Sequence, residues 1–406
     1  MRIGVYGGSF DPLHKGHLAL IEGALSSGIV EIVLVVPSCR NNFKSYTNQL
    51  PAPYRYYMLK GCIEELCLKD VYPCDVEFGI PGTSYTSVIL KKLTDPEYIT
   101  EFLLSNGIKK KRAKEEHSFF WIMGSDTLES FTHWYKPEEI LSYASLLAAL
   151  RPGDDTDIEK TASKIKRELG GNVELFRFNG VECSSSAIIR NRDLTMCPEP
   201  VVRFIELHNL YSENTMLTNV SESDKVGFFE AAIGMYPYLR EKRLLHTLNV
   251  GYLSCALAER FGEDPGRALI AGALHDCAKE LDIDYQRELA MSYAGNVFED
   301  KKLLHSPAGA LFAKERFGID DQAVLDAICY HTTGRGGMSV LEKIVYLADK
   351  IEPSRTYTDL TDIRKMAYTD LDEAVRMTVR SVRNKFEEQG RQIHPYTLAM
   401  MKDLRI

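Results

Sequence analysis

Short apolar runs alternate with amphipathic stretches along the first half of the chain. The apolar runs occupy residues 3–6, 31–37, 71–78, 118–123, 145–150 and 173–176. Between them, residues 18–25, 53–65 and 86–93 carry apolar side chains at helical spacing. Strands that alternate with helices predict an α/β fold with a mostly parallel, Rossmann-like sheet. A ligand site is then expected outside the carboxyl ends of the strands.

The pattern changes in the second half of the chain. Residues 212–224 are rich in Ser, Glu, Asn and Asp, which is typical of a linker. Beyond them, amphipathic helical patterns run from 225 to 384 without convincing strands. We therefore predict an α/β domain over residues 1–211, a linker over 212–224 and an all-α helical bundle over 225–406.

Composition limits the classes of function. A chain of 406 residues is too long for one ordinary domain, and 45% hydrophobic with 26% charged residues is typical of a soluble globular protein. The net charge of −8 argues against a general nucleic-acid-binding protein. There is no apolar run of the roughly 20 residues that span a membrane, and the N-terminus enters a strand directly, without a signal peptide. Nine cysteines, an odd number without a Cys-x-x-Cys pair, favour reduced thiols in a cytoplasm.

A glycine-rich turn with two histidines follows the first predicted strand. Residues 7–17 are Gly-Gly-Ser-Phe-Asp-Pro-Leu-His-Lys-Gly-His. Backbone N–H groups of such a turn can face an anion at a helix N-terminus. His14 and His17 lie on one side of the first helical turn, and Gly16 lets a ligand approach the backbone. We interpret this stretch as a phosphate-binding turn, although Asp11-Pro12 alone would be typical of an ordinary helix start.

These residues resemble the His-x-Gly-His nucleotidylyltransferase superfamily, whose members join a nucleotide from ATP to a phosphate and release pyrophosphate. The resemblance implies that the two histidines contact the nucleotide phosphates. It places further phosphate contacts at Gly7, Gly8, Ser9 and Phe10. It also implies a later Ser-Ser-x-x-Ile-Arg segment that closes over the phosphates, and residues 185–190 are Ser-Ser-Ala-Ile-Ile-Arg. Ser185 and Ser186 are therefore expected at the phosphates, with Arg190 one helical turn onward; an isolated Ser-Ser would be a helix cap.

Three further segments are similar to nicotinate-nucleotide adenylyltransferase. They are Ser84-Tyr85-Thr86, Gly124-x-Asp126 and Trp134-Tyr135-Lys136. The resemblance covers residues 1–211 and implies adenylyl transfer from ATP to nicotinate mononucleotide, giving nicotinate adenine dinucleotide and pyrophosphate. It implies that Trp134 stacks on the pyridine ring, with Thr86 and Tyr135 near its carboxylate, and that Asp126 holds a ribose. Aromatic stacking on a flat ring is physically sensible; the alternative is that Trp134 packs a surface helix.

This chemistry needs no protein nucleophile, because the mononucleotide phosphate attacks the α-phosphorus of ATP. We assign His14, His17 and Arg190 to charge stabilisation, with Mg²⁺ held by the triphosphate. Residues 37–44 depart from the family pattern because they contain no histidine, and Lys44 is expected to replace the basic contact. The connection at 94–116 is longer than usual, and its basic run at 109–112 is expected to be a solvated loop.

The second half places histidines and aspartates within apolar helical sequence. Imidazole and carboxylate groups on separate helices can converge on a metal inside a bundle. A single histidine on an apolar face would more often be a hydrogen-bonded core residue. Several such groups would be expensive to bury without a cation. We predict a metal site formed by His246, His275, Asp276, His305, His331 and Asp349.

Their order resembles the HD-domain metal-dependent phosphohydrolases, and His305 and His331 resemble the subset that holds two metals, with Asp276 suited to bridge them. Residues 275–280, 331–335, 349–355 and 393–395 are similar to the YqeK-type HD family. This resemblance covers about residues 225–400. It implies symmetrical hydrolysis of diadenosine tetraphosphate to two ADP, with iron, although N/O ligands accept several divalent metals. Candidate phosphate contacts are Lys279, Thr333 and Arg335, and Lys279 could equally be a solvated helix residue.

The two halves together predict a cytoplasmic bifunctional enzyme that acts on small nucleotides, with no nucleic-acid or membrane partner; a homo-oligomer is compatible with the sequence. An alternative acceptor in the first domain is nicotinamide mononucleotide or pantetheine phosphate. Alternatives for the second domain are hydrolysis of a nucleoside monophosphate or signalling nucleotide, or nucleotide sensing without turnover. The complete ligand set speaks against a sensor. As a hypothesis for the fusion, the hydrolase would remove dinucleotide by-products.

Overall fold

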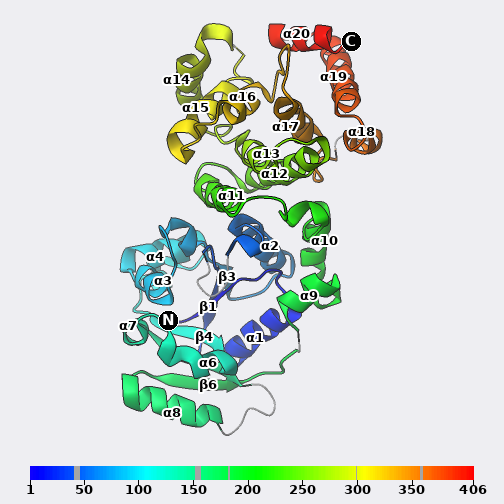
Figure 1. The fold of residues 1–406 in the computed structure, drawn as a ribbon. Helices are drawn as coiled ribbons and strands as arrows, with labels where there is room; N and C mark the ends of the chain where they lie inside the picture. Colours follow the sequence, from blue (N-terminus) through cyan, green and yellow to red (C-terminus); the bar gives the residue numbers. More distant parts are fainter. Residues whose placement is uncertain (41–45, 151–156, 182, 299, 357–359) are drawn as a thin grey trace. The chain divides into compact units, whose positions relative to one another are not determined.

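The computed structural model describes residues 1–40, 46–150, 157–181, 183–298, 300–356 and 360–406 (Figure 1). The chain divides into two compact units, Met1–Phe204 and Ile205–Ile406. Residues 205–211 therefore group with the second unit, while the limits of the linker at 212–224 stay a prediction. In the described residues, no helix is long and apolar enough to cross a membrane.

The first unit is built on a parallel sheet with the order β3-β2-β1-β4-β5-β6 among the described residues. Its strands are β1 (Arg2–Gly8), β2 (Ile32–Pro37), β3 (Val71–Pro73), β4 (Ser118–Gly124), β5 (Ala144–Leu150) and β6 (Val173–Arg177). Its helices are α1 (Lys15–Ser26), α2 (Ala52–Glu65), α3 (Thr86–Leu93), α4 (Pro96–Ser105), α5 (Lys110–Ala113), α6 (Ser125–Ser130), α7 (Pro137–Tyr143), α8 (Asp157–Leu169), α9 (Ser185–Asn191) and α10 (Glu199–Leu207). The predicted α/β fold with a parallel sheet is confirmed.

Helices cover both faces of this sheet, which is why its central strands are almost continuously apolar. One face packs against α3, α4, α6, α7 and α8 through a core that includes Val5, Leu34 and Leu146. The α1 and α2 helices contact the sheet strands from the opposite face, through buried residues such as Ile21 and Leu59. Because helices bury both faces of the sheet, a ligand can reach it only at the ends of the strands.

Two expectations for the first unit were wrong in detail. The strand predicted at 71–78 ends at Pro73, and a 3-10 turn follows at Val76–Gly79; proline cannot donate to a ladder and is typical of a strand end. The basic run at 109–112 is not a loop, because α5 begins at Lys110, and α4 precedes it within the 94–116 connection. Asp95 caps α4 by accepting hydrogen bonds from two backbone N–H groups, and Ile99 anchors that helix in the core.

The second unit is helical throughout its described residues, as the periodicity predicts. Its helices are α11 (Glu222–Met235), α12 (Glu241–Phe261), α13 (Pro265–Leu274), α14 (Ile283–Ala294), α15 (His305–Phe317), α16 (Gln322–Tyr330), α17 (Val340–Ile351), α18 (Thr361–Ala367), α19 (Leu371–Glu388) and α20 (Pro395–Asp403). The α12 and α13 helices cross closely at Gly272, where an added Cβ would lie 2.8 Å from the Val250 carbonyl oxygen. Because of this crossing, α12 packs closely against the C-terminal part of α13.

Candidate functional sites in the two units

The glycine-rich turn of the first unit lies at the point where the strand order reverses. Residues 7–17 begin at the last two residues of β1, and Gly124 to Asp126 begin at the last residue of β4, its neighbour in the sheet. A parallel sheet binds ligands at this switch point. Gly7 has no room for a side chain, since a Cβ there would lie 2.6 Å from the Trp121 ring. The predicted phosphate-binding turn therefore lies at the strand ends where a ligand site is expected in such a sheet.

His14 and His17 form a reciprocal cap at the start of α1. The His17 N–H donates to His14 Nδ1 (3.3 Å), and the His14 N–H donates to His17 Nδ1 (3.2 Å). The two rings stack with centroids 3.6 Å apart. Because each Nδ1 accepts a hydrogen bond, each neutral ring carries its proton on Nε2, where it can donate to an anion. The cap thus leaves two Nε2–H donors at the helix N-terminus.

Both imidazoles are neutral at pH 7. Burial lowers the pKa of His14 to about 4, and burial together with the His14 ring lowers the pKa of His17 well below its usual range. The pair therefore supplies hydrogen bonds rather than full positive charges, and its assignment to charge stabilisation stays a prediction. Of the three residues assigned to that role, only Arg190 is a permanent cation.

The depressed pKa of His14 predicts that acid weakens the fold. A group whose pKa falls from 6.5 to about 4 on folding binds more protons when unfolded, so stability is full above pH 6.5 and decreases toward pH 4. For His14 alone the loss at pH 5 is about 2 kcal/mol. Denaturant titrations of the metal-free chain at pH 7 and pH 5 measure it. In His14→Asn, asparagine keeps an N-cap acceptor but does not titrate, so the pH dependence should shrink; an unchanged dependence would contradict this assignment.

The segment predicted to close over the phosphates contacts the turn. Ser185 Oγ donates to the Pro12 carbonyl oxygen (3.0 Å), which holds the start of α9 against the turn. Ser184, one residue earlier, caps α9 by accepting from the Ala187 N–H. Ser186 and Arg190 are exposed on this short helix. The N-cap role therefore falls on Ser184, and the motif serines are left for other contacts.

The residues expected at the pyridine ring lie in two neighbouring segments. Tyr135, which is 49% exposed, stacks on Tyr85 at 4.1 Å, so the start of α3 with Thr86 lies beside the Trp134–Tyr135 segment. Trp134 is half-buried against Phe131 and the core. These contacts bring the predicted nicotinate-binding residues together.

For two further predicted residues, the structure does not test the expected ligand contacts. Asp126 is exposed after β4, and its carboxylate accepts from the Thr127 N–H (2.9 Å). Lys44 lies outside the described residues. The ribose and basic contacts expected of them stay predictions.

Arg55 is a functional residue that sequence reasoning missed. It is buried in α2 and donates to the carbonyl oxygens of Ser9 (2.7 Å), Ser38 and Leu50. It therefore ties the turn after β1 to the loop after β2. The sequence did contain a signal for this role, because Arg55 stands in a helix whose neighbouring residues are aromatic and apolar. A guanidinium buried in such a helix needs hydrogen-bond acceptors for its N–H groups.

Replacing Arg55 with methionine should destabilise the first unit by about 3 kcal/mol, because three carbonyl groups lose their donor. Denaturant-induced unfolding of the full chain measures the effect. The control is Lys60→Met on the same helix, whose partly exposed ion pair with Glu64 should change stability by less than about 0.5 kcal/mol. Equal effects of the two substitutions would show that Arg55 does not hold the turn.

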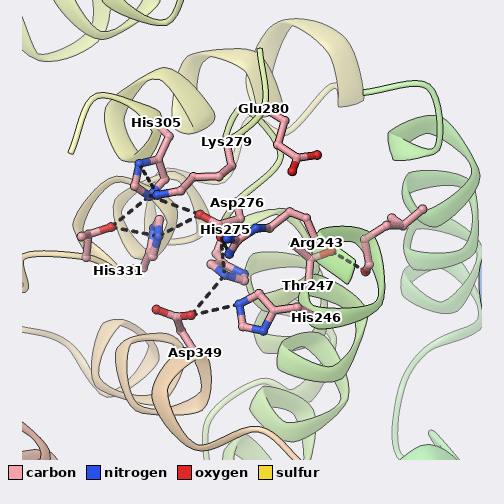
Figure 2. A network of polar contacts seen from close by, with 12 residues as sticks. Arg243, His246, Thr247, His275, Asp276, Lys279, Glu280, His305, His331 and Asp349 are labelled. Carbon is pink, nitrogen blue, oxygen red and sulfur yellow. Dashed lines mark hydrogen bonds and ion pairs between the residues drawn. The ribbon is translucent and has the colours of Figure 1, made fainter. Parts of the chain in front are cut away.

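The predicted ligands of the second unit come from separate elements and converge (Figure 2). Two of the histidines sit at the last turn of a helix, where the Nδ1–H of His275 donates to the Gly272 carbonyl (2.6 Å) and that of His331 to the Ile328 carbonyl (2.7 Å). Both bonds satisfy carbonyls that a helix end leaves free. The other members lie in α12 (His246), after α13 (Asp276), at the start of α15 (His305) and in α17 (Asp349).

These side chains form overlapping groups around Asp276 and Asp349. Asp276 Oδ1 lies 3.2 Å from His305 Nε2 and 3.4 Å from His331 Nε2. On the other side, His275 Nε2 lies 3.6 Å from Asp276 Oδ2 and 3.7 Å from Asp349 Oδ1. Potential ligand atoms within 4.8 Å of one another make three overlapping sets, and Asp276 belongs to two of them. This geometry would suit two cations that share Asp276.

The orientation of the rings favours a cation between these groups. His275 and His331 donate through Nδ1, so in the neutral rings each Nε2 is a lone pair, and it faces carboxylate oxygens that are also acceptors. His331 Nε2 also lies 3.0 Å from the Thr332 hydroxyl, whereas His275 Nε2 faces only acceptors. His275 Nε2 and Asp276 Oδ1 are buried and have no hydrogen-bond partner among the described residues. Buried acceptors that face one another are costly, and a divalent metal would satisfy them all. The residues therefore fit a metal centre.

The protonation states agree with this fit. Burial lowers the pKa of His331 to about 4, so the ring is neutral, as a metal ligand must be. Burial would raise the pKa of Asp276, but the surrounding imidazoles outweigh it and hold that pKa well below the usual range. Asp276 is therefore ionised at neutral pH.

Cations surround the cluster, and sequence reasoning identified only one of them as a candidate. Lys279 Nζ lies 3.0 Å from His305 Nδ1, and Arg243 pairs with Asp276 (2.5 Å). Lys350 and Arg355 pair with Asp349 at 2.7 and 2.8 Å. Each arginine keeps more than a quarter of its side chain exposed. Sequence reasoning missed Arg243 because nothing in its spacing links it to the ligands.

The two other predicted phosphate contacts make different bonds. Arg335 pairs with Asp326 (2.8 Å) and Glu342 (2.6 Å). The Thr333 hydroxyl is buried and donates to the Gly334 carbonyl. These contacts indicate roles in holding the loop after α16.

Comparison with known proteins assigns each unit to a family. The cytidylyltransferase-like family model matches residues 5–191, and the HD domain matches residues 243–354. A symmetrical bis(5′-nucleosyl)-tetraphosphatase of Halalkalibacterium halodurans is 39% identical over 171 residues, which cover 41% of this chain and 91% of that protein. The second unit belongs to this hydrolase family. The chain is a fusion of a cytidylyltransferase-like domain and an HD domain.

Relatives of the whole fusion and of its first half are also known. A probable nicotinate-nucleotide adenylyltransferase/Ap4A hydrolase of Mycoplasma pneumoniae is 28% identical over 389 residues, covering 94% of this chain and 98% of that one. A probable nicotinate-nucleotide adenylyltransferase of Lachnoclostridium phytofermentans is 28% identical over 219 residues, covering 52% of this chain and 98% of that one. The fusion therefore also exists in another protein.

Proposed function

We propose that the cytidylyltransferase-like domain transfers the adenylyl group of ATP to nicotinate mononucleotide. The observation that carries this proposal is the pair of Nε2–H donors at the switch point, with the Arg190 helix held beside them by Ser185. The full-length relative with the same two activities in its name supports the acceptor.

In the proposed reaction, an oxygen of the mononucleotide phosphate bonds to the α-phosphorus of ATP. The bond from that phosphorus to the bridging oxygen breaks, and pyrophosphate leaves. His14 and His17 donate hydrogen bonds to phosphate oxygens, and Arg190 neutralises charge that develops on them. Mg²⁺ bound with ATP supplies further positive charge. Trp134, Thr86 and Tyr135 bind the pyridine ring and thereby align the mononucleotide phosphate for in-line attack on the α-phosphorus.

The test is pyrophosphate release by the full-length chain with ATP and each of three acceptors: nicotinate mononucleotide, nicotinamide mononucleotide and pantetheine phosphate. We expect the highest kcat/KM with the nicotinate compound. A preference for either other acceptor would overturn the substrate assignment but not the fold-based reaction class.

We also propose that the HD domain hydrolyses diadenosine tetraphosphate symmetrically to two ADP. The observation that carries this proposal is the set of buried lone pairs that face Asp276 and Asp349, with exposed cations around them. Water adds to one of the two central phosphorus atoms, and the bond from that atom to the central bridging oxygen breaks, so each product carries two phosphates.

His246, His275, Asp276, His305, His331 and Asp349 would hold the metal, for which we propose two ions, with iron as the first candidate. Divalent ions in such a site activate water and neutralise the phosphate under attack. The chain's own contribution is to orient the ligands and to place Lys279, Arg243 and Arg355 where phosphate oxygens would lie. These side chains would bind and align the four-phosphate bridge.

Metal analysis combined with product analysis tests the second activity. We expect bound divalent metal, and ADP as the sole nucleotide product from diadenosine tetraphosphate. ATP plus AMP would contradict symmetrical cleavage, and binding without product would support a nucleotide sensor instead. Turnover of nucleoside monophosphates at a higher kcat/KM would support the alternative hydrolase.

We place both activities in a cytoplasm, where thiols stay reduced. All nine cysteines are unpaired, and most of them are buried. Light scattering of the full-length chain tests whether it forms a homo-oligomer.

A further inference from the structure

Glu352 is a buried carboxylate that touches a predicted metal ligand but is not itself placed to bind metal. It directly follows α17, is 1% exposed, and its Oε1 lies 3.0 Å from His246 Nδ1. Ser354 donates to it twice, through its N–H and its hydroxyl (both 2.7 Å). Asn249 Nδ2 donates to Oε2 (2.9 Å). With His246 these donors fill the carboxylate's four acceptor positions, so it has no capacity left for a cation.

Asp349 is the carboxylate on the other side of the same ring. Its Oδ1 lies 3.0 Å from His246 Nε2 and also faces His275 Nε2. The His246 ring therefore lies between two carboxylates with different surroundings. Nε2 points to the ligand cluster, where Arg355 Nη2 also lies 3.0 Å from it, while Nδ1 points to the hydrogen-bonded Glu352.

The hydrogen bonds continue from Glu352 to the end of α10. Asn249 Nδ2 also lies 2.9 Å from His208 Nδ1. An amide nitrogen has two protons, so it can donate one to Glu352 and one to His208 only if His208 Nδ1 is an acceptor. His208 lies in the segment that the sequence analysis assigned to the first domain, yet it groups with the helical unit.

All four members of this chain of hydrogen bonds are at least 93% buried. Apolar side chains of similar volume would fill the same space without the cost of desolvating a carboxylate. Burial of such a network therefore indicates a task besides packing. Carboxylates that accept from the outer nitrogen of a metal-bound histidine fix its tautomer and raise its basicity.

We propose that His208, Asn249 and Glu352 are positioning residues that hold the His246 ring with Nε2 as the metal-binding atom. This inference rests on the metal centre proposed above. It assigns a role in the hydrolase to a residue before the predicted linker.

The experiment measures divalent-metal affinity directly on the full-length chain, stripped of metal and titrated with Mn²⁺ by calorimetry. Glu352→Gln keeps the shape but replaces one acceptor oxygen with a donor, so the affinity should fall about 10–100-fold. The matched control is Glu342→Gln, at a glutamate of α17 that is 3% exposed and pairs with Arg335 outside the ligand cluster. Its Mn²⁺ affinity should equal that of the wild type.

A second pair of variants keeps the test independent of whether Glu352→Gln folds. His208→Leu removes the acceptor for Asn249 and should lower Mn²⁺ affinity about fivefold, the effect of one lost hydrogen bond. His208→Asn offers an amide oxygen near the Nδ1 position and should restore most of it. Thermal melts of the metal-free variants separate this effect from general destabilisation.

Each outcome decides a different question. Wild-type chain that binds no Mn²⁺ would overturn both the proposed metal centre and the positioning role. Wild-type binding with unchanged affinity in Glu352→Gln would leave the metal centre standing and overturn the role of Glu352. If His208→Leu lowers the melting temperature but not the affinity, His208 is a packing residue and the positioning role of His208 is wrong.

Discussion

Replacing Asp276 with asparagine should reduce diadenosine tetraphosphate hydrolysis by more than about 100-fold and leave adenylyl transfer unchanged. Asp276 belongs to two of the three candidate ligand sets, so its loss weakens both proposed metal positions at once. Replacing a residue that only hydrogen-bonds to a metal ligand typically lowers metal affinity or activity 10–100-fold. Replacing a ligand shared by both metal positions should lower activity by more than that. Adenylyl transfer should persist because the turn after β1 lies in the other compact unit.

The measurement is the rate of ADP release, together with the metal content of the purified variant. Asp372→Asn is the matched control, since this carboxylate of α19 pairs with Lys343 of α17, away from the ligand cluster. It should retain metal and activity. Hydrolysis of diadenosine tetraphosphate by Asp276→Asn at the wild-type rate would contradict the proposed metal centre.

Replacing His17 with alanine should lower adenylyl transfer about 100–1000-fold, the usual cost of removing one donor aimed at developing charge. Hydrolysis should be unaffected. Because His17 also caps α1, the alanine variant should lose about 1 kcal/mol of stability. Pyrophosphate release at saturating ATP measures the first effect, and denaturant unfolding measures the second.

His17→Asn separates these two roles. Asparagine keeps an oxygen that can accept from the His14 N–H but has no donor at the Nε2 position, so stability should recover while transfer stays low. His117→Ala, at a histidine next to the Ala113 carbonyl, controls for the loss of an imidazole elsewhere in the unit. Recovery of transfer in His17→Asn would mean that the cap, and not the Nε2–H, matters.

Independent sites predict that His17→Ala and Asp276→Asn each abolish one activity and spare the other. A parallel loss of both activities in either variant would indicate coupling between the units. It would also revive the hypothesis that the hydrolase removes by-products of the transferase, which comparison of separated halves with the intact chain then tests.

Hydrophobic patterning was sufficient for the fold class, because burial forces strands and helices to repeat at different periods. It predicted five of the six strands closely and the helical second half. It identified no helix at 94–116, where α4 depends on the Asp95 cap and on packing of Ile99, and the basic run at 109–112 contributes to the short helix α5. The polarity of a short segment does not show whether that segment packs against residues distant in the sequence.

Chemically distinctive residues were also evident in the sequence by itself. His14, His17, His275 and Asp276 stand out because apolar packing would use none of them. The sequence therefore determined an α/β unit with a candidate phosphate-binding turn and a helical unit with a candidate metal site.

Only the tertiary structure decided how these groups are arranged and supported. Helices far apart in the chain decide which nitrogen of His275 faces the cluster. They also place Asp276 between His305 and His331. Arg55 and Glu352 acquire their roles solely from carbonyls and rings that folding brings to them. Their hydrogen bonds join residues distant in sequence, and no periodicity or spacing encodes such contacts.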